Sequence, residues 1–243
     1  MFRNKKTAIL LCLFSMMFIF ANAQVFKGQI IGGVNLSQVD GDNQIGYRKV
    51  GAHAGVGAMF HFNFKKGAET KPWSLSMEIL LNQKGARKRN YYYKDSLPDT
   101  PDGKFEYLLK LNYVSVPVLL HYTDKEKWSF GLGFAYNRMF SVTELEYDVQ
   151  QTYDTVNRLS PTDISVMGDV RFRIWQQLKF GFRFEYSMLS LRTRSFQKNI
   201  YQPSAETRQQ RNNSLTFYLV YMLNEKKVDK EKKKERIEKP YYY

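Results

Sequence analysis

The feature that most constrains the fold of this chain is an alternation of apolar and polar residues that recurs in eight separate segments. In "WSLSMEILLNQK", for example, every second residue from Trp73 to Leu81 is apolar, whereas Ser74, Ser76 and Glu78 lie between them and Asn82 follows. Successive side chains of a β-strand point to opposite faces, so this period of two predicts strands with one apolar and one polar face. The eight segments are residues 28–39, 49–64, 73–84, 107–122, 128–140, 164–175, 178–188 and 213–223.

The lengths of the segments and of their connections favour a membrane barrel. Each segment reaches the roughly 9 to 11 residues that a tilted strand needs to cross a bilayer, and no stretch after Gln24 has the roughly 18 consecutive apolar residues of a membrane helix. Short connections (residues 65–72, 123–127 and 176–177) alternate with long ones (residues 39–48, 85–105, 143–163 and 191–211). Outer-membrane barrels have short periplasmic turns and long external loops, so the sequence predicts an all-β, eight-stranded antiparallel transmembrane β-barrel with long extracellular loops.

The apolar faces are predicted to point outward, toward lipid. Eight strands enclose a narrow interior, which small and polar residues fill more easily than rows of Phe, Tyr and Leu. Trp73 and Trp128 each open a strand after a short turn, where an aromatic girdle is expected. Buried charges need partners, so a structural charge network is predicted to fill the lumen. Its members are Glu78, Asp169, Arg171, Arg173, Arg183 and Glu185.

One segment breaks the alternation. In residues 107–122, Leu109, Leu111 and Tyr113 follow one parity, and the apolar residues from Val114 onward follow the other. If all of them faced lipid, the strand would need an extra residue. We therefore predict a β-bulge near residues 112–114.

Both ends of the chain differ from the strand region, residues 24–223. Residues 1–23 have a basic start, an apolar run that contains the only cysteine, Cys12, and the ending Ala21-Asn22-Ala23, which together predict a cleaved signal peptide. Residues 224–243 are rich in charges of both signs and are predicted to form a periplasmic tail. The net charge of +14 suits an anionic membrane surface better than nucleic acid, which an exported protein rarely meets.

Several of these segments resemble the PorT-like outer-membrane β-barrel family of Bacteroidetes. They are "IGGVNLSQVDGD", "VGAHAGVGAMFHF", "SLSMEILLNQKGA" and "LNYVSVPVLLHY" followed by "WSFGLGFAYNRMF". The family's fourth strand commonly reads Tyr-Leu-Glu-Ile-Pro-Leu-Leu; this chain keeps Tyr113 and Pro117 but has Ser115 in place of the glutamate. The resemblance implies an eight-stranded barrel with a filled lumen, and the founding member serves type IX protein secretion.

Candidate chemistry is sparse. His53 and His61 are eight residues apart on one strand, about 26 Å, and cannot share a metal; His121 lies near the rim of His61. No cofactor and no metal site is predicted, since a metal needs three or four convergent ligands. The residues that suggest an outer-membrane lipid-modifying enzyme are His53, Ser37, Asp40 and Asp42.

Two exposed segments are predicted partner contacts. The loop "GARKRNYYYKD" mixes cationic and aromatic residues, suited to lipopolysaccharide phosphates or a protein, and the tail ends in three tyrosines that could dock on a periplasmic protein. The residues are Arg87, Arg89, Tyr91, Tyr92, Tyr93, Tyr241, Tyr242 and Tyr243. The sequence thus predicts a non-enzymatic outer-membrane barrel for assembly or secretion. The alternatives are a small transport or ligand-binding barrel and, third, the lipid-modifying enzyme.

Overall fold

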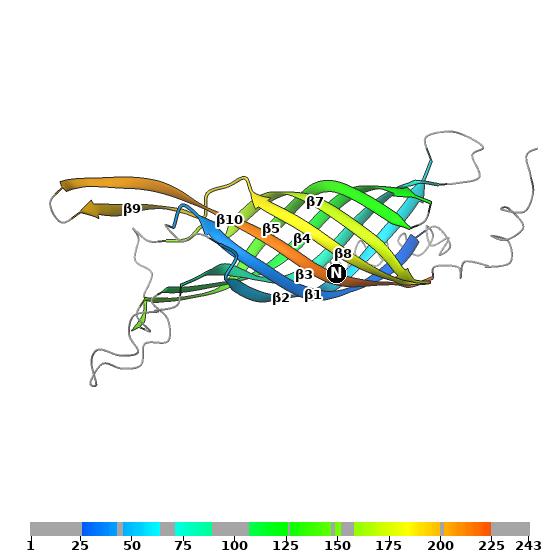
Figure 1. The fold of residues 1–243 in the computed structure, drawn as a ribbon, viewed down its shortest axis with the longest axis horizontal. Coiled ribbons are helices and arrows are strands. Elements are labelled where there is room, and N and C mark those ends of the chain that lie inside the picture. Colours follow the sequence, from blue (N-terminus) through cyan, green and yellow to red (C-terminus); the bar gives the residue numbers. More distant parts are fainter. Residues whose placement is uncertain are drawn as a thin grey trace, which may run out of the picture.

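Eight long antiparallel strands form a closed ring in the computed structural model (Figure 1). The structure describes residues 26–42, 46–63, 71–88, 107–125, 127–146, 149–151, 158–199 and 202–224. The ring strands are β1 (Phe26–Asp40), β2 (Lys49–Phe62), β3 (Trp73–Lys88), β4 (Tyr107–Asp124), β5 (Trp128–Glu146), β7 (Thr162–Trp175), β8 (Leu178–Ser187) and β10 (Gln202–Met222). The eight-stranded antiparallel arrangement predicted from the alternation is confirmed. No helix of the described residues is long and apolar enough to span a membrane.

The ring closes between the first and last strands. Each strand pairs with its neighbour in sequence around the ring, and β1 pairs with β10 without interruption from Gln29↔Met222 to Asp40↔Arg211. Closure removes the unpaired strand edges that a bilayer does not tolerate.

Two further strands lie where the sequence predicted only loops, and this part of the prediction is wrong. β9 (Arg192–Asn199) pairs with the first half of β10 to form a hairpin that projects from one end of the ring, and the short β6 (Val149–Gln150) pairs with the end of β5 (Figure 1). These segments extend past the apolar belt, so their pairing requires no apolar face, and their polar sequences carry no alternation to reveal them.

The outer face of the ring is apolar. Alternate residues of β3 such as Leu75, Met77 and Ile79 are exposed, while the serines and Glu78 between them are buried. Aromatic rings pair on this outer face near the short turns, Trp73 with Tyr122 and Trp128 with Phe172, at centroid distances of 5.2 and 4.7 Å. This is the depth at which the sequence predicted a girdle.

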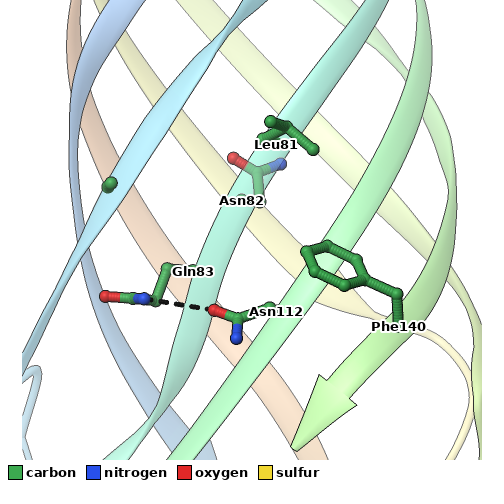
Figure 2. Close-up of a pocket in the computed structure, with 6 residues that line it drawn as sticks. Leu81, Asn82, Gln83, Asn112 and Phe140 are labelled. Carbon is green, nitrogen blue, oxygen red and sulfur yellow. Dashed lines mark hydrogen bonds between the residues drawn. The ribbon is translucent and has the colours of Figure 1, made fainter.

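The irregularity predicted in β4 lies instead on its neighbour. The register between β4 and β5 shifts between Asn112 and Tyr113, but the extra residue is Phe140 of β5 (Figure 2), and β4 alternates without a break. Leu109, Leu111 and Tyr113 therefore point into the ring, where none of them is exposed. The expectation that all apolar rows face lipid is wrong here, because this part of the lumen is filled by an apolar cluster.

Candidate functional site

A cluster of two arginines and two carboxylates fills the centre of the lumen. Arg171 donates to Glu78 at 2.6 Å and to Asp169 at 2.8 Å, and Arg183 donates to the same carboxylates at 2.9 and 3.2 Å. The four residues come from β3, β7 and β8, and all are at most 2% exposed. We name these four residues the central ion cluster. Its formal charges cancel, which is the condition for holding four ionised groups away from water.

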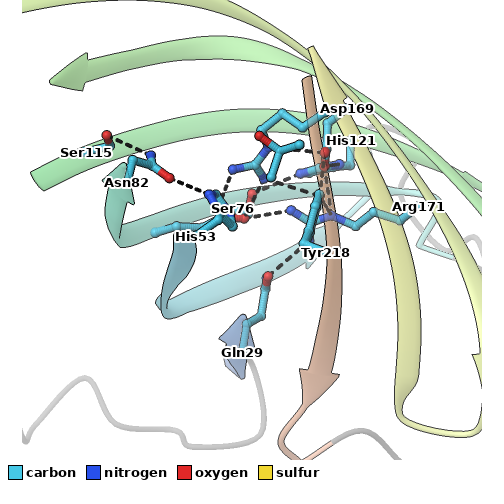
Figure 3. Close-up of polar contacts among 12 residues, drawn as sticks. Gln29, His53, Ser76, Asn82, Ser115, His121, Asp169, Arg171 and Tyr218 are labelled. Atoms are coloured by element: carbon cyan, nitrogen blue, oxygen red, sulfur yellow. Dashed lines mark hydrogen bonds and ion pairs between the residues drawn. The ribbon is translucent and has the colours of Figure 1, made fainter. Parts of the chain in front are cut away.

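Tyr218 and Gln29 complete the hydrogen bonding of the cluster. The Tyr218 hydroxyl donates to Asp169 and accepts from Arg171 at 3.1 Å, while the Arg183 guanidinium carbon lies 5.0 Å from the centre of the tyrosine ring. Gln29 accepts from Arg171 at 3.0 Å. These hydrogen bonds connect β1 and β10, the first and last strands of the ring, to the ion pairs at its centre (Figure 3).

His121 places a serine and a carboxylate on opposite sides of its ring. Its Nε2 lies 2.9 Å from the Ser76 hydroxyl, and its Nδ1 lies 3.8 Å from Asp169 (Figure 3). These residue types are the ones found in hydrolytic triads, but the geometry does not make one. Asp169 is engaged by both arginines and by Tyr218, and Ser76 and His121 are fully buried, so no substrate reaches the serine.

A row of uncharged polar residues lies beside the central ion cluster. His53 is hydrogen-bonded through Nδ1 to Asn82, which donates to Ser115 at 2.9 Å. Thr216 donates to Asn35 at 2.5 Å, and Asn35 contacts Asn82. Ser115, the position at which PorT-like sequences commonly have a glutamate, therefore accepts a neutral hydrogen bond inside the lumen.

A separate ion pair involves Glu185, which does not join the central ion cluster. Its carboxylate accepts from Lys84 at 2.6 Å, from Asn137 at 3.1 Å and from Ser165. Lys84 is 1% exposed and was missed by the sequence reasoning. Its lumen-facing parity in "WSLSMEILLNQK" was the available signal, because an inward lysine on β3 needs a carboxylate partner.

Beyond this pair, a cluster of apolar side chains is packed inside the ring, and we name it the apolar plug. Its Tyr113 also accepts from Asn212 at 3.1 Å and lies under the Lys84 ammonium, 5.5 Å from the ring centre. The plug is formed by the buried residues Val39, Ala86, Tyr107, Leu109, Leu111, Tyr113, Leu159 and Leu191.

A second charged contact lies over the plug, in the part of the ring beyond the membrane. Arg192 of β9 donates to Glu144 of β5 at 2.6 Å, and Tyr107 donates to the same carboxylate at 3.0 Å. Burial alone raises the pKa of Glu144, but hydrogen bonding and attraction from Arg192 outweigh it, and the pKa lies below the ordinary value. Burial raises the pKa of Tyr107, and Glu144 raises it further, so the phenol stays a neutral donor.

The remaining predicted residues are dispersed. Arg173 lies at the end of β7, half-buried, and donates to the carbonyl of Gln176 at 2.9 Å, so it is not in the central ion cluster. Among the enzyme candidates, His53 bonds Asn82, Ser37 donates to the backbone of Lys49 and Gly85, and Asp40 accepts from Gln38. Within the described ranges, no group of three or more His, Cys, Asp or Glu residues is arranged to hold a metal.

Several predictions fall outside the described residues. They are the signal peptide at residues 1–23, the tail at residues 225–243 with Tyr241, Tyr242 and Tyr243, and loop residues Arg89, Tyr91, Tyr92 and Tyr93. Arg87 is described and lies half-buried near the end of β3.

An apolar outer belt, an aromatic girdle and a lumen of paired charges define a transmembrane β-barrel of the outer-membrane class. A family model described as "Outer membrane protein beta-barrel domain" matches residues 22–192, more than half of the chain. The chain therefore belongs to this family of outer-membrane β-barrel proteins, and it is located in the outer membrane.

Several solved outer-membrane proteins are similar to this chain over most of its length. Neisserial surface protein A shares 10% identity and a TM-score of 0.44, covering 81% of this chain and 96% of that one. Ail of Yersinia pestis shares 12% identity and a TM-score of 0.41 (82% and 99%), and a major outer membrane protein of Thermus thermophilus shares 12% and 0.43 (82% and 98%). Comparison with curated protein sequences gave no match.

Proposed function

We propose that this barrel is a non-enzymatic, PorT-like component of protein assembly or secretion, acting through its exposed ends rather than through its lumen. The observation that carries this is the closed interior: the central ion cluster, the Lys84–Glu185 pair and the apolar plug follow one another along the barrel. A barrel whose interior is filled by paired charges and packed apolar side chains supplies a stable membrane anchor. Its short turns are assigned to the periplasm and its long connections to the outside, as in other barrels of this kind.

Planar-bilayer recording tests the closed lumen. The purified chain is expected to give no steady single-channel conductance, because every passage would have to break buried ion pairs or cross the plug. A channel-forming porin in the same bilayers serves as the positive control. A steady conductance would instead favour the transport barrel, the second candidate function.

The partner part of the proposal is tested on the charged tail. Deleting residues 224–243 is expected to remove cross-linked periplasmic partners in cells and to reduce secretion, while the barrel still inserts. Replacing Tyr241, Tyr242 and Tyr243 by alanine separates docking by the aromatic end from the effect of charge. If both variants kept the same partners and the same secretion, the docking role would be refuted.

The lipid-modifying enzyme remains the third candidate. Its strongest histidine, His53, is 2% exposed and hydrogen-bonded inside the lumen, which argues against contact with a lipid headgroup. If lipid A from a His53→Ala strain differed in mass from lipid A of the native strain, the result would favour the lipid-modifying enzyme.

A further inference from the structure

A groove indents the outer face of the barrel at the bulge in β5. It has a volume of about 150 Å³, the size of cavity that accepts a benzene-sized apolar group in a protein interior. Four adjacent strands line it (Figure 2), with Ala52, Leu81, Asn82, Gln83, Asn112 and Phe140. Phe140 is 62% exposed and Leu81 57% exposed, so the groove opens toward the membrane.

The groove exists because of the extra residue in β5. The register shift leaves Phe140 without a partner on β4 and turns both Phe140 and Ser141 outward. The small side chain of Ala52 leaves space on the far side. Gln83 and Asn112 occupy outward positions, where lipid-facing residues are usually apolar, and they are hydrogen-bonded to each other at 3.1 Å.

The depth of the groove matches the boundary of the membrane. Phe140 is twelve residues along β5 from Trp128, the girdle residue near the short turns. At about 3.3 Å per residue and a tilt of about 45°, this separation spans roughly 28 Å of bilayer, close to the ~30 Å of a hydrocarbon core. The groove therefore lies where acyl chains meet headgroups.

Positive side chains lie just beyond the groove on the same strands. Lys110 is two residues before Asn112 on β4, and Arg87 is four residues after Gln83 on β3, so both share the outward parity of the groove. Lys49, beside them at the start of β2, is 6% exposed. Lys49 has the lumen-facing parity of β2, and its pKa is lowered by burial and then by the positive charges of Lys110 and Arg87.

We propose that this groove is a binding site for a phosphate-bearing lipid of the outer leaflet, with an acyl chain against Phe140 and Leu81 and the phosphate against Lys110 and Arg87. A phosphate placed there is attracted by the two outward cations, Arg87 and Lys110, and the Gln83–Asn112 pair offers hydrogen bonds to the polar part of the lipid. The assignment of the lipid to the outer leaflet depends on the orientation proposed above, whereas the existence of the binding site does not depend on that orientation.

Native mass spectrometry of the full chain in detergent tests the site, with diphosphorylated lipid A as the probe and dephosphorylated lipid A as the neutral comparison. The double variant Arg87→Gln/Lys110→Gln is expected to lose about tenfold in affinity for the diphosphorylated probe and little for the neutral one. Phe140→Ala and the groove-filling Ala52→Leu are expected to weaken both.

Matched controls come from the rest of the outer face. Phe134→Ala removes a ring that is 60% exposed on the same strand, and Lys127→Gln removes a cation near the short turns; both are expected to bind like the native chain. Faster migration of unheated samples in SDS gels verifies that each variant is folded. If groove variants and controls bound the probe equally, the lipid would be a general coat and the proposal would be overturned.

The orientation is tested separately. Ser141→Cys is expected to react with a membrane-impermeant maleimide added to intact cells. Labelling only after the periplasm is opened would overturn the orientation and the leaflet assignment, while leaving the binding measurement unaffected.

Discussion

Glu78 is the residue on which the charge balance of the lumen depends. It accepts from both Arg171 and Arg183, and with Asp169 it offsets two cations that have no access to water. Removing one member of a buried ion network leaves an uncompensated charge, which is far more costly than the loss of an exposed pair.

We therefore expect Glu78→Gln to lower the free energy of unfolding by about 3 to 5 kcal/mol. Urea unfolding of the chain refolded into lipid vesicles measures the change. Asp124→Asn, at an exposed position at the end of β4, serves as the control and is expected to change stability by less than about 0.5 kcal/mol. Equal midpoints for the two variants would contradict a neutralised lumen.

Two glycines provide a matched test of how tightly the lumen is filled. A Cβ added to Gly181 would lie 2.2 Å from the Tyr218 ring, whereas one added to Gly32, on the outer face, meets nothing within 4 Å. We expect Gly181→Ala to cost about 1 to 3 kcal/mol and Gly32→Ala to be nearly neutral. Urea unfolding measures the loss of stability in each variant. If Gly181→Ala cost no more than Gly32→Ala, the Tyr218 ring would have moved aside to make room for the added methyl group.

Among the elements, β9 is held to the ring by side chains as well as by its pairing with β10. Arg192 of β9 reaches Glu144 of β5 and also donates to Gln210 of β10 at 2.7 Å, so one guanidinium ties three strands together. The hairpin of β9 and β10 is thereby fixed over the apolar plug.

This contact is expected to make the hairpin sensitive to acid. The pKa of Glu144 is lower in the folded chain than in the unfolded one, so the stability it contributes is complete above about pH 4.3 and is lost as the pH falls through the folded pKa. Hydrogen exchange, corrected for its intrinsic pH dependence, is expected to accelerate in β9 in that acidic range. Glu144→Gln is expected to accelerate it already at neutral pH, whereas Asp124→Asn leaves it unchanged; exchange in β9 independent of this carboxyl would contradict the proposed tie.

The ring strands could be predicted from the sequence because lipid imposes a period of two on every segment that crosses it. The central ion cluster followed from the same parity, since inward charges have to neutralise one another. Which charges pair could not be predicted: Glu185 selects Lys84, and Arg173 lies at a strand end, because pairing depends on stagger around the ring. The side chains of Leu109 and Leu111 point into the lumen because the extra residue lies in β5, at Phe140, and this position could not be read from the sequence of β4. The β9–β10 hairpin lies beyond the lipid, where the period no longer applies.

For the molecule as a whole, closure between β1 and β10 decides whether a barrel exists. A proline in the middle of β10 removes a ladder hydrogen bond and disturbs both neighbouring strands. We expect Leu219→Pro to abolish the faster gel migration of the unheated, folded chain, while Leu219→Val retains it. If the proline variant migrated like the native chain, the β1–β10 ladder would not be needed for closure.

The central ion cluster also has a consequence for biogenesis. Arg171 binds Gln29 across 142 positions of the chain and Glu78 across 93, while Tyr218 is supplied by the last strand. Contacts of such long range form late and slow folding. Until β10 arrives, two guanidinium groups and two carboxylates lack their shared tyrosine, so a truncated chain is penalised for entering lipid. We therefore expect chains that lack β10 to insert less readily than chains that have all their strands.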